Sequence, residues 1–177
     1  MKTQNINKNL KRGFTLLELL VVIVIIGILA SIALPQYKMA VAKSKYNSMK
    51  EITESLAQAV ERYYLATGIP PENLSVLDID IPGEYQSDDK LRKDLPNGGM
   101  CGFNAGSSVR RELICSTKVF GKGIAFLSTF YYNKTQKKNY CYAFSLDTTD
   151  LVNKVCQTDT KQQTPLCRDY YCSYDYQ

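Results

Sequence analysis

The sequence predicts an α+β fold in which a long N-terminal α-helix packs on a small antiparallel β-sheet. Three observations lead to this prediction. The N-terminal third of the 177 residues has no turn signal before Gly68, whereas the rest is rich in Gly, Pro, Asn and Asp. The later part also holds short segments enriched in β-branched and aromatic residues. Finally, all six cysteines follow residue 100, in this turn-rich part.

Charge and composition argue against two broad classes of protein. With 45% hydrophobic and 22% charged residues, the chain does not have the composition of a disordered protein. The net charge is +5, but four cations and no acid precede Gly13, so the rest of the chain carries only +1. These cations are Lys2, Lys8, Lys11 and Arg12. A basic leader on a nearly neutral body does not indicate a nucleic-acid-binding protein.

The segment from Phe14 to Leu34 is the first element, and we expect it to span a membrane. Its only charged residue is Glu18. At 1.5 Å per residue, a helix of this length measures roughly 31 Å, which is close to the thickness of the hydrocarbon layer. The cations Lys11 and Arg12 stay on the cytoplasmic side, so the residues after the segment are expected to be translocated.

Three interpretations of this segment compete. A secretory signal would be cut after the apolar run, near Ser31, and a signal anchor would not be cut at all. Cleavage between Gly13 and Phe14 would instead remove residues 1–13 and leave the apolar helix at the new N-terminus. This third interpretation accounts for Glu18, because the new ammonium of Phe14 would lie one turn away on the same helix face and offset the cost of a carboxylate in lipid. The simpler alternative is that Glu18 reaches the headgroups from the helix end.

Gly13, the following residues Phe14 to Glu18 (FTLLE) and the charge-free run up to Pro35 resemble the class III leader of type IV pilins and of type II secretion pseudopilins. The resemblance implies that a membrane prepilin peptidase cuts after Gly13 and then N-methylates Phe14. It also implies that Glu18 forms an assembly salt bridge with the N-terminus of a neighbouring subunit.

Gly27 and Pro35 lie where the family has them, and they mark the part of the helix that should bend most easily. Glycine weakens a helix by about 1 kcal/mol, and proline removes a hydrogen bond and clashes with the preceding turn. The outcome is either a simple kink or, as the resemblance implies, local melting in the packed filament. Residues 14–35 are thus expected to form a hydrophobic transmembrane and assembly helix.

Residues 36–68 form the second part of the helix, with an amphipathic pattern that should cover the sheet. The predicted apolar stripe consists of Tyr37, Ala40, Val41, Met49, Ile52, Leu56, Ala59, Val60 and Tyr63. Gly68 is expected to end the helix, and Pro70 and Pro71 prevent it from resuming. The whole helix would be about 80 Å long, more than a compact domain needs, so its first half must be buried in lipid or against partner helices.

Residues 69–177 are predicted to form the head. The stretch 69–109 is rich in turn signals and is expected to be a long loop, functional or with small elements of its own, which corresponds by resemblance to the variable loop of pilins. The predicted strands are 110–117, 123–132 and 139–146, with a polar turn at 133–138 and a short fourth strand at 151–155. These strands would form an antiparallel meander on the helix.

The six cysteines indicate disulfides formed in an oxidising compartment, which agrees with translocation. Six cysteines allow fifteen pairings. We predict sequential pairing, which joins Cys101 to Cys115, Cys141 to Cys156, and Cys167 to Cys172. A zinc site is the alternative, although the chain has no histidine and no C-x-x-C motif.

Three further patterns each have a structural and a functional interpretation. The Tyr-rich tail after Cys167 either covers the end of the sheet or contacts other subunits or ligands. Asp147–Asp150 is either a solvated turn or, as in some pseudopilins, a calcium site. Lys134, Lys137 and Lys138 lie near tyrosines and form either a charged hairpin tip or a surface for DNA. We expect the structural interpretation in each case, and therefore neither a metal nor a nucleic acid.

The resemblance implies a structural subunit of a type IV pilus or a pilus-like filament. An enzyme is not expected, because the lack of histidine removes the usual Ser-His-Asp and Cys-His arrangements, and we expect no cofactor. The alternatives are a pseudopilin of a type II secretion system, and a minor pilin that acts as an adhesin or DNA-binding tip subunit.

The partners that the resemblance implies are other copies of the chain, the bacterial inner membrane, the prepilin peptidase, an assembly ATPase and a platform protein. An outer-membrane secretin is a further candidate. The head would lie in the periplasm before assembly and at the cell surface in the pilus afterwards.

Overall fold

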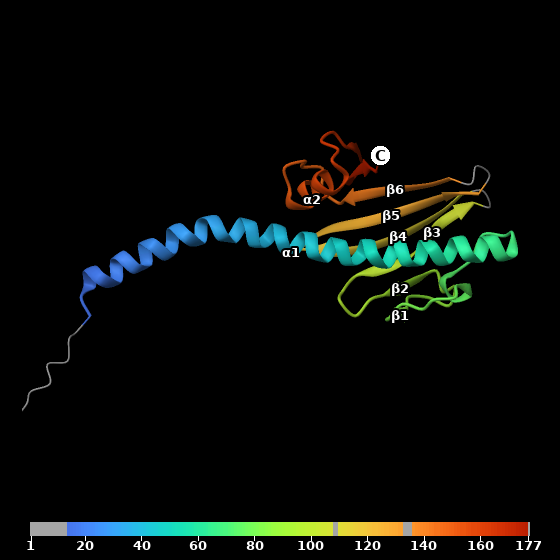
Figure 1. The fold of residues 1–177 in the computed structure, drawn as a ribbon, viewed down its shortest axis with the longest axis horizontal. Helices are drawn as coiled ribbons and strands as arrows, with labels where there is room; N and C mark the ends of the chain where they lie inside the picture. Colours follow the sequence, from blue (N-terminus) through green and yellow to red (C-terminus); the bar gives the residue numbers. More distant parts are fainter. Residues whose placement is uncertain (1–13, 108–109, 133–135, 177) are drawn as a thin grey trace, which may run out of the picture. The chain divides into compact units, whose positions relative to one another are not determined.

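The computed structural model describes residues 14–107, 110–132 and 136–176 (Figure 1). Contacts divide the chain into two compact units, the first ending at Lys38 and the second comprising residues 39–177. In the second unit a long helix packs on an antiparallel sheet, so the predicted α+β fold is confirmed.

Helix α1 runs from Leu16 to Thr67 and contains Pro35 in its interior. It ends as the sequence predicts. Gly68 has a φ of +72°, in the left-handed region that favours glycine, and its amide donates a hydrogen bond to the carbonyl oxygen of Tyr64 at 2.8 Å.

Within the described residues the sheet has eight strands, all antiparallel, in the order β1-β2-β3-β4-β5-β6-β8-β7. The four central strands are the longest, and they are β3 (Met100–Ser107), β4 (Arg110–Val119), β5 (Lys122–Tyr131) and β6 (Gln136–Ala143). The short flanking strands are β1 (Glu84–Tyr85) and β2 (Arg92–Asp94) on one side, and β8 (Tyr171–Asp175) and β7 (Leu166–Arg168) on the other. Consecutive strands pair from β1 to β6, and β4, β5 and β6 are the part of this meander that was predicted.

Residues 39–67 of α1 cover one face of the sheet, as Figure 1 shows. Tyr46 packs with Phe126 in one core cluster, and Leu56 packs with Phe103 in another. The buried stripe begins later than predicted, because Tyr37 belongs to the first unit and is 65% exposed. The fully buried positions of α1 are Ala42, Tyr46, Met49, Thr53, Leu56, Ala57, Ala59 and Val60.

The stretch 69–109, predicted as a long loop, contains a short 3₁₀-helix, η1 (Leu74–Val76), and strands β1, β2 and β3. One glycine of this region, Gly102, serves the sheet, whereas Gly98 lies in a turn with a φ of +76°. A Cβ on Gly102 would lie 2.3 Å from the carbonyl oxygen of Leu91, so glycine is needed where the backbones approach closely beside the pairing of β2 with β3.

Several predicted strand boundaries also shift. Strand β6 begins at Gln136, inside the stretch predicted as a polar turn, and ends at Ala143 rather than at residue 146. Residues 133–135, the rest of that turn, lie outside the described part of the chain. Strand β4 extends to Val119, two residues beyond its predicted end.

The predicted short strand at 151–155 is wrong, because these residues begin helix α2 (Leu151–Thr160). Val152, Val155 and Cys156 recur at helical spacing and are buried in the core cluster that contains Tyr46. The two valines raise the local β propensity, but packing of this face against the core favours the helix.

Candidate functional site

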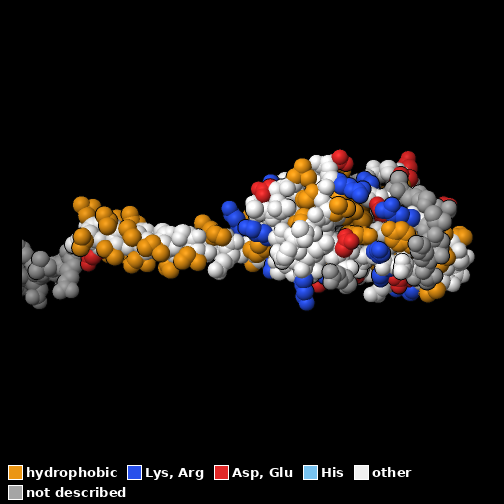
Figure 2. Space-filling model, turned by 90° about the horizontal axis from the view of Figure 1, so that it is seen from above, with side chains coloured by type: hydrophobic (Ala, Val, Ile, Leu, Met, Phe, Trp, Pro, Cys, Tyr) orange, Lys and Arg blue, Asp and Glu red, His pale blue; other side chains and the backbone are white. Residues whose placement is uncertain are grey.

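The apolar side chains between residues 14 and 34 are exposed. Every Leu, Ile and Val in this range has at least 43% of its surface exposed, and Phe14 has 75%. Figure 2 shows hydrophobic side chains along this segment. The most apolar window of α1 has a mean hydropathy of 2.9, and by length and composition the helix could cross a membrane. A continuous apolar surface of this extent requires cover from outside the chain.

Thr15 and Glu18 form a capping box at the start of α1. The amide of Glu18 donates a hydrogen bond to Oγ1 of Thr15 at 3.2 Å, and the amide of Thr15 donates one to Oε2 of Glu18 at 2.9 Å. The Thr15 hydroxyl also donates to Oε2, at 2.7 Å. These bonds satisfy donors that have no partner in the first turn of a helix. The arrangement was not predicted here, although T-x-x-E is its sequence signature.

Glu18 therefore has a hydrogen-bond partner in its own chain. Both bonds that it accepts among the described residues use Oε2. A cation could approach through Oε1 without displacing Thr15. Gly13 lies outside the described residues, so cleavage between Gly13 and Phe14, methylation of Phe14 and the intersubunit role of Glu18 stay predictions.

Gly27 and Pro35 both lie inside α1, which is continuous through them. A Cβ on Gly27 would contact nothing within 4 Å, so packing within this chain does not require glycine there. Pro35 has no amide hydrogen, and it therefore leaves the carbonyl of Ser31 without its usual helical donor. Bending or melting between these residues during assembly stays a prediction.

Three disulfides join elements of the head, and each pairs consecutive cysteines. Cys101–Cys115 joins β3 to β4, and Cys141–Cys156 joins β6 to α2. Cys167–Cys172 joins β7 to β8. None of the six cysteines, all of which lie in the described ranges, is free. Zinc ligation would require these bonds to be reduced.

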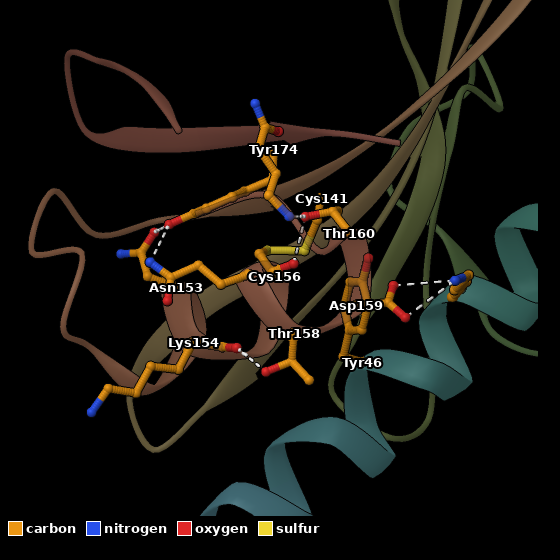
Figure 3. Close-up of a disulfide and its surroundings, with 12 residues drawn as sticks. Tyr46, Cys141, Asn153, Lys154, Cys156, Thr158, Asp159, Thr160 and Tyr174 are labelled. Atoms are coloured by element: carbon orange, nitrogen blue, oxygen red, sulfur yellow. Dashed lines mark hydrogen bonds and ion pairs between the residues drawn. A yellow bond between two sulfur atoms is a disulfide. The ribbon is translucent and has the colours of Figure 1, made fainter. Parts of the chain in front are cut away.

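The Cys141–Cys156 bond lies in the core beside α2 (Figure 3). Both cysteines are fully buried. On the same helix, Oδ1 of Asn153 accepts a hydrogen bond from the Tyr174 hydroxyl at 2.8 Å, and Nδ2 donates to the carbonyl of Ser145 at 3.0 Å. The disulfide and these bonds fix α2 to the sheet and to the C-terminal strand.

A second polar cluster joins α1 to the C-terminal tail. The hydroxyl oxygens of Tyr46 and Tyr176 lie 2.6 Å apart, and the Tyr176 hydroxyl donates to Asp159. Nζ of Lys50 lies 3.1 Å from Oδ2 of Asp159. Burial, followed by the proximity of Tyr176, raises the pKa of the Tyr46 phenol. Tyr174 is also buried in the adjoining core, so these two tail tyrosines take the structural role that the sequence favoured.

The Asp147–Asp150 turn uses its carboxylates internally. Asp147 accepts hydrogen bonds from the amide and the hydroxyl of Thr149, and Asp150 pairs with Lys122. The Thr149 hydroxyl bond lowers the pKa of Asp147, and the Lys122 hydrogen bond lowers that of Asp150. Among the described residues, no group of three or more Asp, Glu or Cys side chains could hold a metal ion.

The lysines near the β5–β6 hairpin are only partly described. Nζ of Lys137 lies 2.9 Å from Oε1 of Glu61 on α1, which favours the interpretation as a charged hairpin tip. Lys134 lies outside the described residues.

Comparison with known proteins identifies similar sequences in bacterial fimbriae. The family described as the prokaryotic N-terminal methylation motif matches residues 8–34. A fimbrial protein of Neisseria meningitidis is 28% identical over 165 residues, which cover 90% of this chain and 95% of that protein. The type IV major pilin PilE1 of Neisseria gonorrhoeae is 36% identical over 109 residues, 59% of this chain and 58% of that pilin.

A shorter alignment shows higher identity. The type IV major fimbrial protein FimA of Dichelobacter nodosus is 46% identical over 54 residues, which cover 30% of this chain and 35% of that protein. No solved structure matches significantly.

Proposed function

We propose that this chain is a member of the type IV pilin family and a structural subunit of a type IV pilus or a pilus-like filament. The observation that carries the proposal is the exposed apolar first half of α1. This half of the helix lies within the match to the methylation motif, and an α+β head follows it in the sequence. The similar proteins are a fimbrial protein and type IV major pilins, which favours a pilus over the pseudopilus of a type II secretion system.

In this proposal residues 1–13 are a leader, and residues 14–35 first hold the subunit in the inner membrane. The Lys11-Arg12 pair keeps the leader on the cytoplasmic side and places the head, residues 69–177, in the periplasm. Residues 36–68 join the two. A prepilin peptidase then cuts after Gly13, and an assembly ATPase and a platform protein move the subunit into the filament.

The same apolar surface serves both environments. In the membrane it contacts lipid, and in the filament it contacts the equivalent helices of other copies. Both surroundings are apolar. Transfer of the subunit from the membrane to the filament therefore hardly changes how far its leucine and isoleucine side chains are shielded from water. Packing of the helices supplies cohesion, and charge pairs define their register.

Glu18 has two partners in succession in this scheme. Before assembly its carboxylate caps the helix through Thr15. After cleavage, the Phe14 ammonium of a neighbouring copy approaches the same carboxylate. An acid surrounded by packed apolar helices is costly unless a cation neutralises it, so a subunit placed out of register is disfavoured.

Processing is expected to give a mature chain that starts at Phe14 with a methylated α-amine. Intact mass measurement and N-terminal sequencing of subunits from cells with an active prepilin peptidase test this expectation. Subunits from cells that lack the peptidase are the control and should keep residues 1–13. A mature chain that starts near Leu34 would instead indicate a secretory signal and contradict the proposal.

A further inference from the structure

Lysines gather at one end of the sheet, where the β4–β5 turn and the start of α2 lie (Figure 1). Nζ of Lys45 on α1 donates a hydrogen bond to the carbonyl of Lys118, which lies one residue before the end of β4. Lys122, the first residue of β5, forms an ion pair with Asp150, the N-cap residue of α2. These two contacts bring α1, the turn and α2 to the same end of the sheet.

Two further lysines extend this surface along α1 and α2. Lys43 lines a small cleft of about 130 Å³, and Val155 of α2 lines the same cleft. Lys154 precedes Val155 on α2, and its side chain extends away from the core in Figure 3. We call this surface the basic end. Its lysines are Lys43, Lys45, Lys118, Lys122 and Lys154.

Three ammonium groups of the basic end form no hydrogen bond or ion pair with the described residues. These groups belong to Lys43, Lys118 and Lys154. The acids around them already have partners. Asp150 pairs with Lys122. Asp159, which lines the cleft, pairs with Lys50. Asp147 accepts hydrogen bonds within its own turn. The basic end therefore carries positive charge that the described residues do not compensate.

The apolar segment ends a short distance before the basic end along the chain. Lys43 follows Leu34 by nine positions, and α1 includes both residues. Nine helical residues rise about 14 Å. The headgroup layer adds roughly 5–7 Å beyond the hydrocarbon on each side of a bilayer, and a charge acts over about 8 Å at physiological ionic strength. A membrane that contains residues 14–34 thus brings its headgroups within electrostatic reach of Lys43.

We propose that the basic end binds the phosphates of anionic lipid headgroups while the subunit is held in the membrane before assembly. The proposal rests on the proposed function, because it needs residues 14–35 to be inserted in the inner membrane. An anionic bilayer strengthens binding by a factor on the order of five for each lysine near its surface. Three ammonium groups without acidic partners match such a surface in charge. Because a lysine lacks the planar fork of arginine, we expect recognition of headgroup charge rather than of one particular lipid.

Labelling of lysine amines in the full chain, reconstituted in lipid nanodiscs, tests this contact. One set of discs contains phosphatidylcholine alone, and the other contains phosphatidylcholine with the anionic lipid phosphatidylglycerol. A water-soluble acylating reagent modifies accessible amines, and mass spectrometry of peptides gives the rate at each lysine. In the anionic discs we expect Lys43, Lys118 and Lys154 to react about fivefold more slowly. In about 1 M salt, where charges act over only about 3 Å, this difference should disappear.

Lys138 is the matched control within the same chain. Its side chain is exposed and forms no hydrogen bond or ion pair with the described residues. It lies opposite Thr129 in the strand register, seven positions along β5 from Lys122. Its rate should be the same in both sets of discs. Equal rates at the basic end in the two sets would overturn the proposal, whereas a chain that inserts into neither set would contradict the proposed function itself.

Inorganic phosphate added to the neutral discs distinguishes a lipid surface from a soluble anion. We expect the rates at the basic end to stay unchanged, because single phosphate ions lack the charge density of a membrane surface. Protection as strong as that in the anionic discs would overturn the proposal and identify a site for free phosphate.

The chain with Lys43→Gln, Lys118→Gln and Lys154→Gln tests whether these three charges hold the contact. Lys45 is kept as the reporter, and in this variant it should react at the same rate in both sets of discs. The melting temperature should not change, since the replaced side chains have no partners. The control Lys138→Gln should keep the slower reaction of Lys45 in anionic discs. Undiminished protection of Lys45 in the triple variant would overturn the proposal.

Discussion

Glu18→Gln is expected to stop efficient incorporation of the subunit into filaments while cleavage after Gly13 continues. Gln can replace Glu in a capping box, so the hydrogen bonds with Thr15 should remain. The variant therefore removes the charge and keeps the cap. A buried cation left without its partner costs about 3–5 kcal/mol, which reduces incorporation by a factor on the order of 100 or more. Filament yield, with the amount of cleaved subunit measured in parallel, gives the result.

Thr15→Ala is the matched control for this prediction. It removes the threonine hydroxyl from the cap and keeps the carboxylate of Glu18. Loss of an N-cap side chain costs about 0.5–2 kcal/mol, so we expect a modest effect. Wild-type filament yield from Glu18→Gln together with a large loss from Thr15→Ala would mean that Glu18 acts only as a cap.

Replacement of both Cys141 and Cys156 by Ala is expected to cause the largest loss of stability among the three disulfides. The bond closes a loop with a sequence separation of 15 residues, for which the loss of chain entropy predicts about 3 kcal/mol. It also joins two fully buried positions and fixes α2 to β6. For a chain of this size, the melting temperature should fall by about 6–12 °C.

Thermal unfolding of the full chain in detergent, followed by circular dichroism, measures this effect. The matched control replaces Cys167 and Cys172 by Ala, since this bond closes a separation of only 5 residues near the C-terminus. We expect a smaller decrease there. A difference between the two pairs no larger than the roughly 1 kcal/mol that their loop lengths predict would show that the tie between α2 and the sheet adds nothing beyond loop closure.

The elements with strong local signals could be predicted from the sequence. Gly68 and the two prolines after it indicate the end of α1, and the aromatic and β-branched run at 123–132 indicates β5. The sequential pairing of cysteines is also the pairing in the structure. In each of these cases, the structure that residues close in the sequence favour is also the structure that they adopt in the fold.

The elements that were missed depend on tertiary contacts. Gly98 does lie in a turn, but Gly102, in the same glycine-rich stretch, is required by a close backbone approach between strands. In α2, packing of Val152 and Val155 against the core outweighs their β propensity. The capping box is an exception, because its T-x-x-E signature is present at Thr15 and Glu18 and could be read from the sequence. The contact between the rings of Tyr64 and Tyr132 could not be predicted, because the two residues meet only after folding.

In the proposed filament, cleavage after Gly13 creates a cation at Phe14, and this cation meets Glu18 of a neighbouring subunit. A reconstruction of native filaments by electron cryomicroscopy, at a resolution that shows side chains, would show whether this contact forms. We predict that the methylated nitrogen of Phe14 lies within about 4 Å of a Glu18 carboxylate oxygen of another copy. Subunits that retain residues 1–13 in the filament, or a Glu18 that contacts only Thr15 of its own chain, would contradict this contact between subunits.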